Sequence, residues 1–199
     1  MTVNSQAAKN AITNATIENE MIGDLSKTNT INAVAQVLWK EARGEGIDGL
    51  KAIASVILNR TGNDPSYITD VLKQSEAFSC MNGYNGGWID KTYRFFVPWK
   101  AIKDVPSNLE IWEDCKDIAS QLVNKKFTST IGNRNSYLNK DTASKTAKDT
   151  WGKKCDLQIG KHHFGYLKEH DPKYVKPGTM TTWKKLNKKG GKYIVVKSG

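Results

Sequence analysis

Two apolar segments joined by a glycine-rich turn constrain the fold most. Residues 30–43, TINAVAQVLWKEAR, carry apolar side chains at helical spacing, and residues 47–60, IDGLKAIASVILNR, repeat the pattern. Thr30 is a suitable N-cap for the first segment, and Gly44 and Gly46 interrupt the pattern between the two. Because an apolar helix face has to be buried, we expect two consecutive helices packed into one core.

The other periodic segments complete a mixed domain. We expect two more helices and three short strands, at residues 66–74, 107–126, 130–139, 157–166 and 193–196. Ser107 is the expected N-cap of the long helix. The expected buried side of that helix consists of Leu109, Trp112, Ile118, Ala119, Leu122 and Val123. These segments predict the α+β fold class, mainly α.

Length and composition fit one domain with short extensions. The chain has 199 residues, of which 38% are hydrophobic and 25% charged, and a chain of this length can bury a core without disulfides or a metal. We divide it into an N-terminal arm at 1–29, a main folded domain at 30–170 and a basic C-terminal extension at 171–199.

No export or membrane signal is visible in the sequence. Residues 1–24 lack the basic and apolar regions of a signal peptide, and no stretch approaches the roughly 20 apolar residues of a membrane span. The cysteines are odd in number and widely spaced, which does not fit a disulfide framework. We expect a protein made in the cytoplasm, with reduced thiols at Cys80, Cys115 and Cys155.

Glu41 is the residue with the clearest chemical meaning. It follows Val37 by four residues and Leu38 by three, so it falls on the apolar face of the first helix, just before the glycine turn. A carboxyl group there loses hydration, which favours its protonated form. A general acid for glycosidic bond cleavage must hold a proton near neutral pH. The alternative is a structural glutamate, paired with Lys40 or Arg43.

Residues 75–99 form a second region of interest. The segment is rich in Gly, Asn and aromatic residues, and Gly83, Gly86 and Gly87 favour irregular turns. Long loops on rigid scaffolds collect binding residues. We therefore expect a functional loop here.

Four blocks of sequence resemble, in the same order, the SleB/CwlJ-like family of cell-wall hydrolases, which includes spore-cortex-lytic enzymes and phage-encoded relatives. The first block, WKEARGEGIDGLKAIASVILNR at 39–60, resembles the family's EARGE turn and the VILNR helix after it. Three shorter blocks follow: FSCMN at 78–82, SYLN at 136–139, and Trp151 with IGKHHFGY at 159–166.

The resemblance implies a lysozyme-like, lytic-transglycosylase-like domain that cuts peptidoglycan between N-acetylmuramic acid and N-acetylglucosamine without a cofactor or a metal. It implies that Glu41 is the catalytic acid. A lytic transglycosylase needs one carboxyl group, because the sugar's own 6-hydroxyl closes a 1,6-anhydro ring, whereas most glycosidases use two. A water-using muramidase stays open, with Glu45 and Glu76 as candidate second carboxylates.

The sequence departs from the family pattern in two places. Asn135 and Ser136 replace an expected Thr-His pair, and the last block contains Lys161 and an apparently inserted Gly165. These departures affect the expected details of sugar binding and leave Glu41 unchanged.

Aromatic and amide side chains suit a sugar site, because they stack on pyranose rings and bind N-acetyl groups. The candidates for substrate binding are Tyr137, Asn139, Phe78, Ser79, Tyr84, Trp88 and Tyr166. Supporting roles are expected for Arg43, Glu45, Trp151 and His162. Among these, we expect Glu45 to hold the turn through Arg43 or backbone amides, and His162 to be a hydrogen-bonded structural residue.

The histidines and Cys80 raise two alternative chemistries. Zinc is disfavoured, because the adjacent His162 and His163 point to opposite sides of a strand and no HExxH or CxxC motif is present. Cys80 with His162 would suit a cysteine-histidine amidase or peptidase, although no known motif of that class surrounds Cys80.

The chain carries a net charge of +10, which draws it to polyanions. Near the C-terminus lie Lys184, Lys185, Lys188, Lys189, Lys192 and Lys197. A basic module that binds nucleic acid through phosphates is the non-enzymatic alternative, but no nucleic-acid-binding signature accompanies these lysines. We favour retention on anionic wall polymer or lipopolysaccharide.

The expected setting is a bacteriophage. A wall hydrolase without an export signal can be an endolysin released through a holin, or a virion component that contacts other virion proteins. In either setting it acts on the bacterial cell wall.

Overall fold

The computed structural model describes residues 30–74, 77–78, 80, 84–85, 88–89, 106–177, 181–184 and 194–197. For the strands at 84–85, 88–89, 181–184 and 194–197 it describes the backbone path. Among these described residues, no helix is long and apolar enough to cross a membrane.

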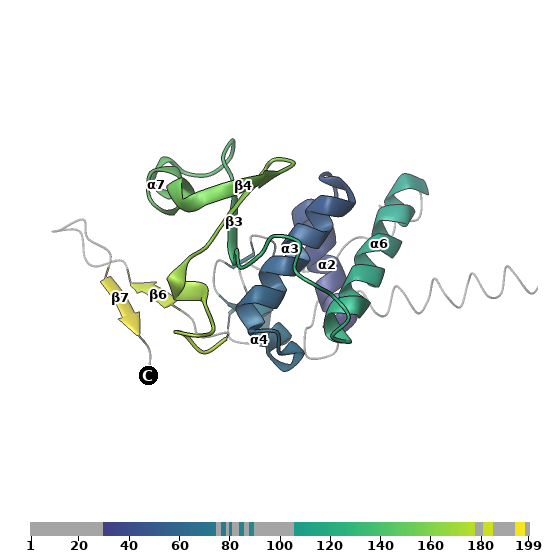
Figure 1. Cartoon of the computed structure of the whole chain (residues 1–199), viewed down its shortest axis with the longest axis horizontal. Coiled ribbons are helices and arrows are strands. Elements are labelled where there is room, and N and C mark those ends of the chain that lie inside the picture. The colour runs from purple at the N-terminus through teal and green to yellow at the C-terminus, as the bar shows by residue number, and fades with distance from the viewer. Residues whose placement is uncertain are drawn as a thin grey trace, which may run out of the picture.

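Three long helices form the main layer of the domain. They are α2 (Thr30–Ala42), α3 (Gly46–Thr61) and α6 (Pro106–Val123), which contact one another in pairs and stand side by side in Figure 1. The first two confirm the helices predicted at 30–43 and 47–60. Their apolar faces meet those of α6 in one buried cluster, so helix packing supplies the core.

A small antiparallel sheet lies on the opposite side of α3 from α6 (Figure 1). Its strands are β3 (Ser136–Asn139), β4 (Cys155–Ile159) and β5 (His162–Gly165), with β5 in the middle. The molecule is therefore α+β and mainly α, as the sequence predicts.

The segment 157–166 was predicted as one strand, and that prediction is wrong. It contains the end of β4, a turn at Gly160 and Lys161, and all of β5. Gly160 has a φ of 57°, in the left-handed region that glycine adopts readily. Position 165 also requires glycine, because a Cβ there would lie 2.6 Å from the carbonyl oxygen of Lys154.

The long helix also differs from its prediction. It begins at Pro106, which suits a first helical turn, so Ser107 lies inside the helix and is not its cap. It ends at Val123, before Lys125 with its φ of 59°. Leu109 is 39% exposed and Val123 is partly buried, while Cys115 is fully buried on the inner side.

Shorter elements complete the described fold. The helix predicted at 66–74 is a 3-10 turn followed by a short α-helix, and the predicted edge strand starts one residue later than expected and pairs with an unpredicted partner. Two short strands pair within the predicted loop at 75–99. These elements are η1 (Pro65–Tyr67), α4 (Ile68–Lys73), β1 (Tyr84–Asn85), β2 (Trp88–Ile89), α7 (Lys145–Asp149), η3 (Trp151–Lys154), η4 (Lys168–His170), β6 (Thr181–Lys184) and β7 (Ile194–Lys197).

The core predicts a contrast between two leucines of α6. Leu122 is 1% exposed and Leu109 is 39% exposed. Leu122→Ala should lower the free energy of unfolding by about 2–5 kcal/mol, because it leaves a cavity between the helices. Leu109→Ala is the matched control and should cost less than about 1 kcal/mol. Urea unfolding measures both, and equal losses would contradict the described packing of α6.

Candidate functional site

Glu41 lies in the last turn of α2 and is held at both carboxylate oxygens. One oxygen accepts the backbone N–H of Cys80 at 2.9 Å, and the other accepts the hydroxyl of Tyr137 at 2.9 Å. Its side chain is half-buried. The predicted position on the inner side of the helix is thus observed, with partners from two distant parts of the chain.

Tyr137 brings the sheet to Glu41. It lies on β3, and its ring contacts Phe78, His162 and Phe164 at centroid distances of 6.3, 5.2 and 5.9 Å. Burial and the neighbouring carboxylate of Glu41 raise the pKa of Tyr137 well above its usual range. The hydroxyl therefore keeps its proton at neutral pH and can donate it in a hydrogen bond to Glu41.

His162 lies on β5 beside this pair. It is 8% exposed, and its ring meets Tyr137 edge-on, with an angle of 81° between the planes. Burial lowers its pKa. Its Nδ1 is buried without a hydrogen-bond partner among the described residues, so the hydrogen bonding expected of His162 is not seen at this nitrogen, where the ring packs against Tyr137.

Glu45 lies four residues after Glu41, at the N-cap position of α3, and contacts a different part of the sheet. Its Oε2 accepts the backbone N–H of Lys161 at 2.7 Å, in the turn between β4 and β5. We expected Glu45 to hold its own turn through Arg43 or backbone amides. The amide that it binds belongs instead to a hairpin 116 residues further along the chain. Arg43 is exposed, and its guanidinium lies 5.9 Å from the ring centre of Trp39.

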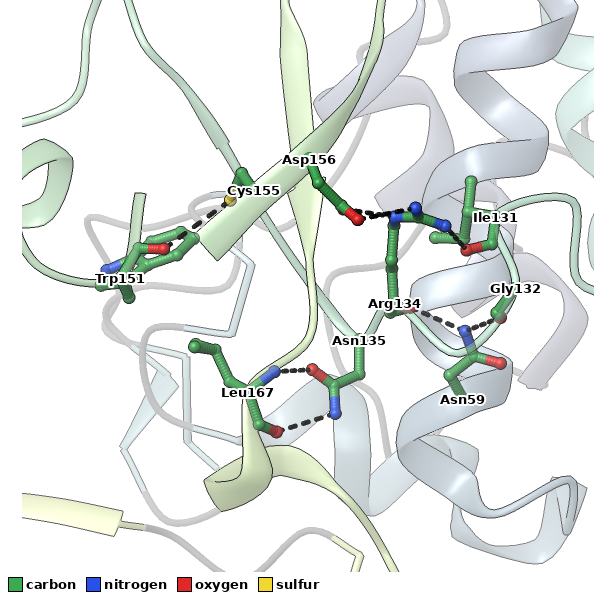
Figure 2. A network of polar contacts seen from close by, with 9 residues as sticks. All are labelled: Asn59, Ile131, Gly132, Arg134, Asn135, Trp151, Cys155, Asp156 and Leu167. Atoms are coloured by element: carbon green, nitrogen blue, oxygen red, sulfur yellow. Dashed lines mark hydrogen bonds and ion pairs between the residues drawn. The ribbon is translucent and has the colours of Figure 1, made fainter. Parts of the chain in front are cut away.

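The end of α3 fixes the chain that leads into β3. The amide of Asn59 donates to the carbonyl oxygens of Gly132 and Arg134 at 2.8 and 2.6 Å, and Figure 2 shows these two bonds. Arg60, the next residue, donates from Nε to the carbonyl oxygen of Asn135 at 2.6 Å. The VILNR motif therefore ends in two polar residues that hold the strand carrying Tyr137.

Asn135 and Ser136, the residues that depart from the family pattern, are both buried. The side chain of Asn135 pairs with the backbone N–H and carbonyl of Leu167, at 2.8 and 2.9 Å (Figure 2). The hydroxyl of Ser136 lies 2.7 Å from Nδ1 of His170. Both side chains thus stabilise the fold and do not face a substrate.

Figure 2 also shows how the loop before β3 is tied to the neighbouring strand. Arg134 donates two hydrogen bonds to the carboxylate of Asp156 on β4, at 2.7 and 2.9 Å. A third bond runs from its guanidinium to the carbonyl oxygen of Ile131 at 2.8 Å. The ion pair is exposed, so it contributes little to the free energy of unfolding and serves mainly to orient the loop.

The structure divides the remaining candidates. Phe78 is fully buried beneath Tyr137, so it is a core residue and does not stack on a sugar. Asn139 accepts the backbone N–H of Asp141 and holds the turn after β3. Tyr166 donates its hydroxyl to Asp171 at 2.6 Å.

Other candidates are less fully described. Trp151 is half-buried at the start of η3. Ser79 and Glu76 lie outside the described residues, and for Tyr84 and Trp88 the description covers the backbone. Their expected roles stay predictions.

Arg60 is the residue that sequence reasoning missed. It is 4% exposed, and its guanidinium lies 3.1 Å from Nδ1 of His170 and 5.8 Å from the ring centre of Phe78. A signal was present, because Arg60 follows Ile57 by three residues and Ile53 by seven and so shares their apolar face. A charge on an apolar face is the same signal that singled out Glu41.

His170 should make stability depend on pH. Burial and the nearby Arg60 lower its pKa to about 3, whereas the unfolded chain takes up the proton near pH 6.5. The contribution of neutral His170 to the free energy of unfolding is therefore complete above about pH 6.5, and it is lost as the pH falls toward 3. At pH 4 the loss is at most about 3 kcal/mol.

Urea unfolding between pH 7 and 4 tests this. His170→Gln should flatten the loss of stability on acidification, while His163→Gln, on the half-exposed side of β5, should leave most of it. An unchanged slope in His170→Gln would contradict a half-buried His170 that stays neutral in the folded protein.

Comparison with known proteins gives a family. A family described as Cell Wall Hydrolase matches residues 44–165, starting three residues after Glu41. The spore cortex-lytic enzyme of Oceanobacillus iheyensis is 29% identical over 140 residues, which cover 68% of this chain and 41% of that protein. The chain thus spans about two fifths of the length of this relative.

One solved structure was also found to be similar. It is the catalytic domain of the germination-specific lytic transglycosylase SleB from Bacillus anthracis, with 26% identity and a TM-score of 0.37 over 69% of this chain and 93% of that one. The family match covers more than half of the chain, from the turn after α2 to the end of β5. The chain belongs to the Cell Wall Hydrolase family.

Proposed function

We propose that this chain cleaves the glycan strand of peptidoglycan between N-acetylmuramic acid and N-acetylglucosamine, as a lytic transglycosylase in which Glu41 is the catalytic acid and base. Membership of the Cell Wall Hydrolase family supports the substrate. The observation that carries the assignment is the half-buried carboxylate of Glu41, which accepts hydrogen bonds from the Cys80 amide and the Tyr137 hydroxyl.

The hydroxyl of Tyr137 suits a carboxyl group that changes its protonation during a reaction. A phenol can donate to an ionised carboxylate and accept from a protonated carboxylic acid. Glu41 can therefore keep the same partner while it gives its proton to the glycosidic oxygen and later takes one from the 6-hydroxyl of the muramic acid. The amide of Cys80 fixes the other oxygen, so the group stays oriented throughout.

The chemistry balances without water. The bond between C1 of the muramic acid and the bridging oxygen breaks, and Glu41 gives that oxygen its proton. The 6-oxygen of the same sugar bonds to C1, and its proton returns to Glu41. One carboxyl group completes the cycle, in contrast to the two that most glycosidases use.

The contacts of Glu45 support a reaction with one carboxyl group. Its Oε2 already accepts a backbone amide of the hairpin turn, so it is engaged in structure at the place where a second carboxylate was considered. Water-dependent cleavage by a muramidase is the competing reaction, and it would need another group to activate the water.

The thiol of Cys80 does not suit the cysteine-histidine alternative. Burial and the adjacent carboxylate of Glu41 raise its pKa well above the ordinary value. A nucleophilic cysteine needs the opposite, a thiolate stabilised by neighbouring positive charge. Cys80 therefore serves Glu41 through its backbone N–H.

The finer setting proposed from the sequence is a phage endolysin or virion-carried hydrolase, with C-terminal lysines that bind anionic wall polymer. Family membership supports action on the bacterial cell wall. The phage origin and the role of the lysines stay predictions, as do the proposed bounds of the three regions.

Replacing the acid tests the assignment of Glu41. Glu41→Gln keeps the size of the side chain but has no proton to give, so release of fragments from purified peptidoglycan should fall by about a thousandfold or more. Glu113→Gln, at an exposed position of α6, is the matched control and should retain the wild-type rate. A folded Glu41→Gln variant that keeps substantial activity would refute the role of Glu41.

Removing one hydroxyl tests its partner. Tyr137→Phe keeps the ring contacts with Phe78, His162 and Phe164 but loses the hydrogen bond to Glu41. We expect the turnover rate to fall by about 10- to 100-fold, with a change in unfolding free energy of only about 1 kcal/mol. Steady-state digestion and thermal unfolding measure the two effects, and an unchanged turnover rate would contradict the proposed pairing.

A further inference from the structure

The turn between α2 and α3 places two carboxylates against one sheet. Glu41 contacts β3 through the Tyr137 hydroxyl, and Glu45 contacts the turn between β4 and β5 through the Lys161 amide. The two glutamates lie four residues apart, Glu41 in the last turn of α2 and Glu45 at the N-cap position of α3, so the junction of the two helices contacts the sheet at two points.

Glu45 reaches the hairpin instead of capping its own helix. It occupies the N-cap position of α3, where a short polar side chain such as that of Ser or Asp commonly accepts a backbone N–H of the first turn. In the described structure its side chain makes no such bond. Its Oε2 accepts the N–H of Lys161 at 2.7 Å, so the carboxylate is committed to the sheet.

Two glycines leave room for this arrangement. A Cβ at Gly49 would collide with the Cβ of Glu45, and a Cβ at Gly160 would overlap its Oε2. Gly160 also has a φ of 57°, which brings the next amide to face the carboxylate. The chain on both sides of Glu45 is thus shaped to admit it.

The position of the hairpin turn affects the contacts of the proposed acid, Glu41. Lys161 precedes β5, which pairs with β3 so that His162 faces Asn139 and Phe164 faces Tyr137. His162 and Phe164 are also the ring neighbours of Tyr137. Moving the hairpin turn therefore moves the side chains that aim the Tyr137 hydroxyl at Glu41.

We infer that Glu45 is a positioning residue, which holds the β4–β5 turn so that Tyr137 stays in contact with Glu41, and is not a second catalytic carboxylate. The inference rests on the proposed function of Glu41. The positioning role requires an oxygen at residue 45 that accepts a hydrogen bond, and it requires neither a proton nor a charge there.

Three variants separate these roles. Glu45→Gln retains an oxygen that can accept the Lys161 amide, so its turnover rate should stay within about threefold of wild type. Glu45→Ala should lower the turnover rate by about tenfold or more with little change in KM. Gly160→Ala should act like Glu45→Ala, because the new Cβ displaces the carboxylate. Glu113→Ala is the control for loss of an exposed glutamate.

A double-mutant cycle with Tyr137→Phe tests the route of the effect. If Glu45 acts by aiming the Tyr137 hydroxyl, Glu45→Ala should cost much less once that hydroxyl is gone. Losses that simply multiply would overturn the inference. Equal, large losses in Glu45→Gln and Glu45→Ala would also overturn it, because they would show that the charge or proton of Glu45 is required.

Amide exchange supplies a readout that does not depend on activity. The Lys161 amide should exchange slowly in the wild type and in Glu45→Gln, and fast in Glu45→Ala. Fast exchange in the wild type would overturn the inference. If the wild type cuts no peptidoglycan but the Lys161 amide follows this pattern, the proposed function fails while the holding contact stands.

Discussion

The hydrogen bond between Tyr137 and Glu41 is the contact on which the site depends, because it joins the helical layer to the sheet at the proposed catalytic acid. Each partner lies on an element that is held in place by other contacts. α2 is buried along its inner face, and β3 is flanked by the middle strand of the sheet. A carboxylate half out of water needs such partners, since leaving it unpaired would cost several kcal/mol by order of magnitude.

Polar side chains set the position of the sheet on the helices. The sheet has three short strands, which give it little stability alone. Asn59 and Arg60 hold the chain entering β3, and Glu45 holds the turn before β5. Arg60 gains a further contact from the neutral His170. Polar contacts of fixed geometry thus specify an orientation that apolar packing alone would leave loose.

Patterns of apolar spacing predicted the elements built from local sequence, including both helices around the EARGE turn and the inner position of Glu41. They failed at the β4–β5 hairpin, where Glu45 contacts the turn at Gly160 and Lys161 from a distant part of the chain. The preference of sugar sites for aromatic residues placed Phe78 at the substrate, whereas the structure has it in the core. Long-range contacts such as those of Tyr137 and Arg60 carry no local signal beyond a polar group on an apolar face.

The most direct test of the central claim is digestion of purified peptidoglycan by the wild-type protein in ¹⁸O-labelled water, with mass spectrometry of the new glycan ends. A reaction that uses Glu41 alone, with the 6-hydroxyl as nucleophile, predicts 1,6-anhydromuramic ends that carry no label from the water. Labelled reducing muramic ends would contradict it and establish a muramidase. Cut peptides on intact glycan strands would contradict glycan cleavage itself.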